Sequence, residues 1–136
     1  MRIAVLREAD ERERRVPIVP DSIKRLAGKK IQVSVETGAG ERALSSDDEY
    51  TSAGAKVVAS PAEAISDSDC VMRLRVPALE EIALLKEGST LIGPVYPLVN
   101  REIVDALAAR KITTLALDAI PRTTVAQMMD VLSSQA

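Results

Sequence analysis

The chain has 136 residues, enough for one α/β domain with its own core and too few for two. Its formal net charge of -2 and its near lack of aromatic side chains argue against a nucleic-acid surface, and its single cysteine excludes an internal disulfide. Histidine is absent, so the commonest general acid or base at neutral pH and the commonest metal ligand are both missing. We therefore expect a site that positions a ligand, with no metal.

Short apolar runs alternate with helical patterns along the chain. The expected strands cover residues 2–6, 31–35, 56–58, 70–76, 91–92 and 112–117. The first expected helix is capped by Asp21 or Ser22, and the last is capped by Asn100. The others begin at Asp47, Pro61 and Leu79. This alternation predicts right-handed βαβ crossovers. The predicted fold class is α/β, with a mainly parallel sheet flanked by helices in a Rossmann-like or flavodoxin-like three-layer architecture.

The sequence has no apolar run that approaches the length of a membrane span, and a strand pattern begins at once, with no signal peptide. We therefore expect a cytoplasmic protein.

A glycine-rich segment contains Gly38, Gly40 and Ala43, which formally satisfy the G-x-G-x-x-A dinucleotide fingerprint. Ser45 and Ser46 interrupt a helix there, and the next strand ends without the acidic residue that a ribose requires. We therefore predict a glycine-rich turn.

Several arginines follow the predicted strands, whose carboxyl ends meet at one edge of a parallel sheet. Arginines without histidine suit the binding of a carboxylate, phosphate or amide better than proton transfer. Arg12 and Arg14 are interpreted as solvated, whereas Arg15 is as consistent with a site as with a loop. Arg73 and Arg75 are predicted to share one face of strand 70–76, and Arg75 is the better site candidate. A partner-facing or edge position for both remains open.

The run after the last predicted strand breaks at Pro121 and then has a helical pattern. Its apolar stripe consists of Val125, Met128, Met129 and Leu132, and its polar stripe of Gln127, Asp130 and Ser134. Thr124 and Gln127 have the spacing of a capping box, so a structural role for Gln127 stays open. Their combination with Arg122 at the carboxyl edge of a sheet favours binding of a small polar ligand.

Several segments together resemble the N-terminal part of the alanine dehydrogenase and nicotinamide nucleotide transhydrogenase family. They are Met1-Arg-Ile, Arg15-Val16, residues 36–41 and 53–55, the pair Val76-Pro77, and the run from Pro121 to Ala136. Within that family the last run is the most specific piece, and it is similar to the NAD(P) transhydrogenase alpha subunit.

Two positions separate the branches of this family. The resemblance implies that alanine dehydrogenases bind pyruvate or alanine with an arginine matching Arg15, a lysine at the position of Arg75 and a histidine at the position of Tyr96. Arginine does not release a proton near neutral pH, and tyrosine substitutes poorly for imidazole. Arg15, Arg75 and Tyr96 thus form a substrate-like pocket that favours transhydrogenation. An alanine-dehydrogenase-like NAD-dependent oxidoreductase and a non-catalytic binding or scaffold module remain alternatives.

The transhydrogenase resemblance implies that Arg122, Gln127 and Asp130 lie next to the nicotinamide of NAD(H) as catalytic and cofactor-binding residues. It implies that Ser133 helps to hold the ring's amide. Direct hydride transfer needs two rings held face to face without water, and no acid or base. The resemblance also implies NADP(H) on a partner component, proton translocation in the full complex, and a homodimer attached to the inner membrane through partner subunits.

Residues 1–136 are expected to form a single N-terminal domain. In the family this segment is followed by an NAD-binding Rossmann domain, which is absent after residue 136 in this sequence. We therefore expect an isolated fragment that is inactive and that binds NAD(H) weakly or not at all.

Overall fold

The computed structural model describes residues 1–121 and 123–129. Within them lie six parallel strands in one sheet: β1 (Arg2–Val5), β2 (Gln32–Glu36), β3 (Lys56–Val58), β4 (Cys70–Met72), β5 (Thr90–Gly93) and β6 (Thr113–Ala116). The helices are α1 (Pro20–Ala27), α2 (Asp47–Ala53), α3 (Pro61–Ser66), α4 (Leu79–Leu84) and α5 (Arg101–Ala109). Three short 3-10 turns are η1 (Glu41–Ala43), η2 (Leu117–Ala119) and η3 (Gln127–Met129).

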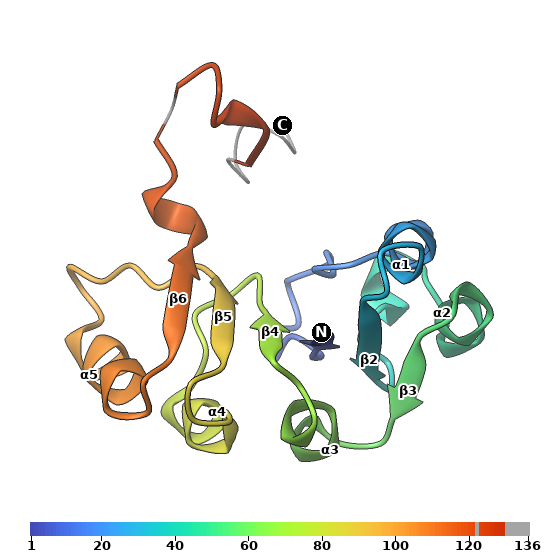
Figure 1. Cartoon of the computed structure of the whole chain (residues 1–136), viewed down its shortest axis with the longest axis horizontal. Helices are drawn as coiled ribbons and strands as arrows, with labels where there is room; N and C mark the ends of the chain where they lie inside the picture. Colours follow the sequence, from blue (N-terminus) through green and yellow to red (C-terminus); the bar gives the residue numbers. More distant parts are fainter. Residues whose placement is uncertain (122, 130–136) are drawn as a thin grey trace.

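The strand order is β3-β2-β1-β4-β5-β6, and every neighbouring pair is parallel. The predicted α/β fold with a parallel sheet is confirmed. The chain builds outward from β1 to β3, returns through α3 to β4 beside β1, and then builds outward in the other direction (Figure 1). In such doubly wound sheets, ligands bind beyond the carboxyl ends of the strands where the order reverses. The loops after β1 and β4 are therefore the first place to look for a site.

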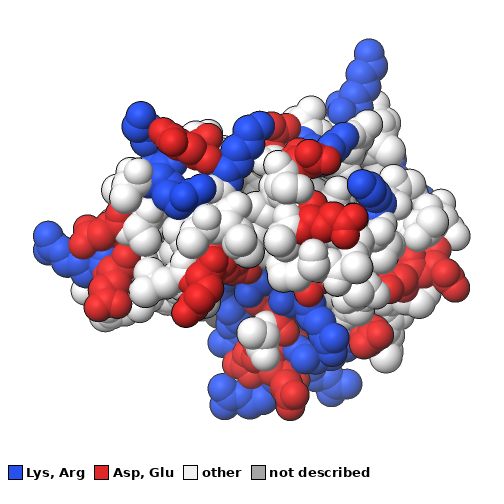
Figure 2. Space-filling model, turned by 90° about the horizontal axis from the view of Figure 1, so that it is seen from below, with Lys and Arg blue, Asp and Glu red and all other residues white. Residues whose placement is uncertain are grey.

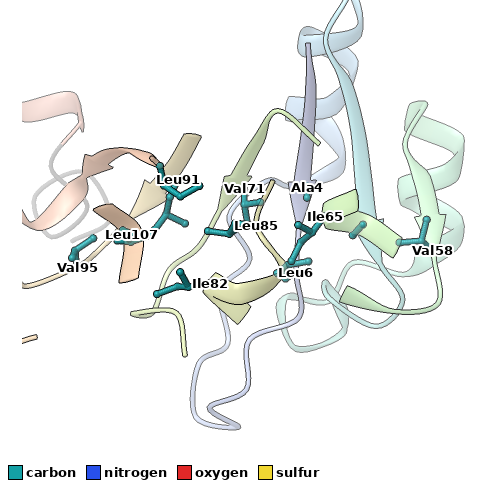
Figure 3. Packing of buried hydrophobic residues seen from close by; sticks show 12 residues of the cluster. Ala4, Leu6, Val58, Ile65, Val71, Ile82, Leu85, Leu91, Val95 and Leu107 are labelled. Carbon is teal, nitrogen blue, oxygen red and sulfur yellow. The ribbon is translucent and has the colours of Figure 1, made fainter. Parts of the chain in front are cut away.

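Two apolar clusters cover the two faces of the sheet because side chains alternate along each strand. Ala4 on β1 and Leu6 directly after it belong to the cluster that packs against α3, α4 and α5, which Figure 3 shows. Ile3 and Val5 belong to the other cluster, which packs against α1 and α2. Both clusters consist almost wholly of aliphatic side chains, as the composition requires. No helix of the described residues is long and apolar enough to cross a membrane.

The glycine-rich segment after β2 is a turn, as predicted, and η1 follows it. Gly38 has a φ of +75°, a conformation that favours glycine. A Cβ on Gly40 would lie 2.5 Å from Cε2 of Tyr50, so only glycine fits against that buried ring. Tyr50 is fully buried, and its hydroxyl donates to the carbonyl of Ile18 at 2.8 Å, which ties α2 to the loop before α1.

The prediction of one strand over residues 70–76 is wrong, because β4 ends at Met72. The backbone N–H of Leu74 donates to a carboxylate oxygen of Glu8 at 2.8 Å, and the chain bends there instead of continuing the sheet. Arg73 and Arg75 therefore do not share a strand face. Arg73 is 6% exposed, whereas the side chain of Arg75 is 51% exposed.

The predicted cap of α1 is wrong, and that of α5 is only partly right. Helix α1 begins at Pro20, with Val19 at the N-cap and no side-chain cap, because proline fits a first turn whose N–H groups lack partners anyway. At α5, Asn100 does occupy the N-cap position. Its amide Nδ2 instead donates to the carbonyl of Val95 at 2.8 Å, so it stabilises the preceding loop.

The predicted helix after Pro121 lies partly outside the described residues, including Leu132 and Ser134. The described part contains only the 3-10 turn η3. Thr123, not Thr124, accepts the hydrogen bond from the N–H of Ala126 at 3.3 Å. Val125 is 91% exposed, so it does not belong to a buried stripe.

Candidate functional site

A buried ionic cluster joins the loops that follow β1 and β4. The Nη2 of Arg73 lies 3.1 Å from Glu8 Oε2, and its Nη1 lies 3.2 Å from Glu81 Oε1 on α4. The same Nη1 donates to the carbonyl of Arg7 at 3.2 Å. Glu8 also accepts from Leu74, so its carboxylate contacts both loops. The cluster therefore clamps the two loops together at the point where the strand order reverses.

The cluster holds two carboxylates for one guanidinium. Burial raises the pKa of Glu81, and the attraction of Arg73 only partly offsets this effect. Arg73 Nε and Glu81 Oε2 have no hydrogen-bond partner within the described residues. Removing one partner from such a buried ion pair lowers the free energy of unfolding far more than replacing all of its charged side chains with apolar ones would. The cluster thus fixes the loop geometry more than it stabilises the fold.

Above this clamp, the carboxylate of Glu13 bridges two of the predicted site arginines. Arg15 donates from Nε and Nη2 to the two Glu13 oxygens at 2.8 and 2.9 Å, and Arg75 Nε lies 3.0 Å from Oε2. Glu13 is 4% exposed, whereas both arginine side chains are about half exposed. The hydrogen bonds from Arg15 lower the pKa of Glu13 to about 2 despite its burial, so it is ionised at neutral pH. Sequence reasoning did not single out Glu13.

Asp10 extends this ionic network towards solvent. It accepts a forked pair of hydrogen bonds from Arg12 at 3.1 and 3.2 Å, and its Oδ2 lies 3.6 Å from Arg75 Nη2. The hydrogen bonds from Arg12 lower the pKa of Asp10 to about 2. The predicted exposure of Arg12 and Arg14 is confirmed. The Arg75 guanidinium is thus shared by two carboxylates.

Tyr96, the third residue of the predicted substrate-like pocket, lies in the loop between β5 and α5. Its backbone N–H and that of Val95 donate to the two oxygens of Asp118 at 3.1 and 2.8 Å. Asp118 follows β6, so it fixes the neighbouring loop. The Tyr96 side chain is about half exposed, and no hydrogen bond within the described residues links it to Glu13. The structure brings Arg15 and Arg75 together but does not join Tyr96 to them.

The predicted nicotinamide contacts lie at the end of the chain. Arg122, Asp130 and Ser133 are outside the described residues. Gln127 is exposed in η3, and no hydrogen bond of its side chain to the loops after β1 and β4 is present in the described part. In Figure 1 the described segment after β6 extends away from the sheet. The roles of these four residues therefore stay predictions.

The parallel sheet with the order β3-β2-β1-β4-β5-β6 defines a Rossmann-type α/β domain, and arginine-rich loops lie where that order reverses. The family model described as "Alanine dehydrogenase/PNT, N-terminal domain" matches residues 4–136. This chain therefore belongs to that family, and the resemblance predicted from the sequence is confirmed.

The transhydrogenases compared below have higher sequence identity to this chain than the alanine dehydrogenase has. The chain is 42% identical over 140 residues to the first part of NAD(P) transhydrogenase subunit alpha from Rhodospirillum rubrum, and the match covers 99% of this chain and 36% of the relative. The structure of a transhydrogenase from Sinorhizobium meliloti has a TM-score of 0.92 and 36% identity over 99% of this chain and 40% of that one. A structure of L-alanine dehydrogenase has a TM-score of 0.84 and 28% identity over 93% and 34%. The chain thus spans between a third and two fifths of the length of these proteins.

Proposed function

We propose that this chain is the N-terminal half of the NAD(H)-binding component of a nicotinamide nucleotide transhydrogenase. The complete protein would transfer hydride from NADH to NADP+, and the full complex would couple this transfer to proton translocation. The 42% identity across 99% of the chain with a relative that bears the transhydrogenase name supports the proposal.

The observation that carries the choice between branches is the bridging position of Glu13. Its carboxylate already pairs with Arg15 and Arg75, whose counterparts in alanine dehydrogenases are implied to hold the substrate. A substrate carboxylate would have to compete with an ionised, buried side chain for both arginines. Neither guanidinium can act as an acid or base near neutral pH, and Tyr96 has no imidazole chemistry. The group is better suited to holding two loops than to oxidising an amino acid.

In the proposed enzyme, Arg122, Gln127, Asp130 and Ser133 orient the nicotinamide of NAD(H). An amide, a carboxylate and a hydroxyl can fix the ring's carboxamide, and an arginine can pair with a ribose or phosphate oxygen. A following Rossmann domain supplies the remainder of the NAD(H) site, and NADP(H) binds to a partner component. The proposed assembly is a homodimer of this component with a membrane-embedded partner and an NADP-binding partner.

Two assays on the complete protein separate the candidate functions. Hydride exchange between NADH and an analogue of NADP+ is expected, without oxidation of NADH that depends on pyruvate. The reverse result would favour the alanine-dehydrogenase-like alternative. Absence of both activities, with binding of the partner components retained, would favour a non-catalytic scaffold.

A titration tests whether the nicotinamide site is shared with the following domain. Calorimetry of the 136-residue chain with NADH is expected to show weak or no binding, because one wall of the proposed site belongs to another domain. Submicromolar affinity of this chain alone would contradict the half-site proposal.

A further inference from the structure

An arginine-rich hollow of about 550 Å³ lies between the β1–α1 loop and η1, near the ionic network around Glu13. Its lining residues are Arg7, Glu11, Arg12, Arg14, Glu41, Arg42 and Leu44. The set does not include Arg15 or Arg75. In Figure 2, charged side chains of both signs gather densely on the projection at the lower centre of the view, consistent with the mixed charges of residues 7–15.

Two backbone carbonyls fix the position of Arg42 at this hollow, and no carboxylate of the described residues pairs with it. Its Nη1 donates to the carbonyls of Glu8 and Asp10 at 3.0 and 2.9 Å, and the side chain is partly buried. The described residues place no acidic oxygen within ion-pair distance of it. A guanidinium that is fixed by two neutral acceptors keeps its full positive charge and its other N–H donors for a ligand.

Two further arginines are available at the same hollow. Arg14 is exposed, with no hydrogen bond or ion pair to any described residue. Arg7 is only loosely paired, since its Nη2 lies 4.0 Å from Glu41 Oε2. Its Nη1 would lie 3.4 Å from a Cβ at Gly38, so the glycine leaves room for this guanidinium beside the turn.

The chemistry of the lining defines the class of ligand. Arg12 is already paired with Asp10. The other three guanidinium groups of the lining face two carboxylates, which leaves a net charge of about +1, and Leu44 is the only apolar side chain of the lining. The lining therefore favours an anion. Guanidinium groups bind phosphate oxygens through forked pairs of hydrogen bonds, and a phosphate has nearly two negative charges near neutral pH, so three arginines at one hollow suit a phosphate better than a singly charged carboxylate. The volume lies within the usual range for small-molecule sites.

We propose that this hollow binds the phosphate groups of a small phosphorylated molecule through Arg7, Arg14 and Arg42. Glu41 moves from Arg7 when the anion enters, at little cost because their pair is long and exposed. The site is independent of the proposed nicotinamide contacts, so it does not depend on the proposed function.

The test is a titration of ¹⁵N-labelled 136-residue chain with inorganic pyrophosphate at constant ionic strength, followed by backbone amide shifts. Saturable shifts are expected in residues 7–14 and 38–44, with a Kd of roughly 1 mM or lower. Arg14→Ala is expected to weaken binding by about fivefold, since it removes one charge-assisted contact and no contact within the fold. Arg25→Ala is the matched control, because Arg25 is an exposed arginine on α1 with no ion pair to any described residue.

A second variant and a second ligand sharpen the result. Arg7→Ala should weaken binding as Arg14→Ala does, and amide spectra of the free variants report whether the fold is retained. ADP that binds more tightly than pyrophosphate, with added shifts at Leu44, would identify a nucleotide as the source of the phosphate. Equal binding would identify an inorganic or sugar phosphate. Shifts that do not saturate, or an equal loss in Arg25→Ala, would overturn the proposal.

Discussion

Replacing Glu13 with Gln tests whether the Arg15–Glu13–Arg75 group holds the loops together. The side chain keeps its size and loses the charge that pairs with both arginines. The pKa of Glu13 falls from 4.5 to about 2, and each pKa unit corresponds to about 1.4 kcal/mol, so the largest possible loss is about 3.4 kcal/mol. Because both arginines are half exposed and water screens them, we expect a loss of about 1–2 kcal/mol.

The pH dependence of this loss has a definite sign. A lowered pKa in the folded state gives stability that is present above pH 4.5 and is lost as the pH falls towards 2. Glu13→Gln should therefore be destabilised relative to the natural chain at pH 7, and this difference should shrink towards pH 2.

Urea unfolding followed by circular dichroism measures the effect. With a slope of about 2 kcal/mol per molar urea, the middle of the usual range, the midpoint at pH 7 should fall by roughly 0.5–1 M. Glu11→Gln is the matched control, because Glu11 is an exposed acid of the same loop with no ion pair to any described residue. Equal midpoints for the two variants at pH 7, or a difference that persists at pH 2, would refute the reasoning.

Three other substitutions test a buried charge, a buried hydrogen bond and a close backbone contact elsewhere in the fold. Glu81→Gln should leave stability at pH 7 unchanged or raise it, because Arg73 keeps Glu8 as its partner and the raised pKa of Glu81 shows that burial disfavours its charged form. The natural chain should lose stability as the pH rises above 4.5, and urea midpoints at pH 5 and 8 should show that the variant lacks this trend. Tyr50→Phe removes the buried hydrogen bond to Ile18 and should cost about 1–2 kcal/mol in thermal unfolding. Gly93→Ala places a Cβ 2.8 Å from the carbonyl oxygen of Arg73 and should cost about 1–3 kcal/mol, and an unchanged urea midpoint would contradict that close contact.

The sheet could be predicted because its signal is local. Each apolar run is short, and each is followed by a helical pattern, so the order of elements and the parallel sheet follow from the chain alone. The end of β4 could not be predicted in this way. It depends on the hydrogen bond between Leu74 and Glu8, which are 66 residues apart, and sequence alternation simply continues through Arg73 and Arg75.

The site was only partly predictable for a similar reason. Arg15 could be proposed from its loop after the first strand and Arg75 from its place near the end of a predicted strand, and the structure brings both to one carboxylate. Glu13 is one of several acids in a dense charge run, and nothing local shows that it is the one that becomes buried with two arginines. Arg42 was missed because its partners are backbone carbonyls, which leave no trace in the side-chain pattern.

The most direct test of the proposed function is the rate of hydride transfer in the complete protein with its partner components. The double variant Gln127→Ala and Asp130→Asn should slow exchange between NADH and an analogue of NADP+ by about 100-fold, because misplacement of one ring removes the orientation on which the reaction depends. Asp105→Asn, an exposed change on α5, should leave the rate unchanged. Equal rates in the double variant and the natural protein would contradict the account.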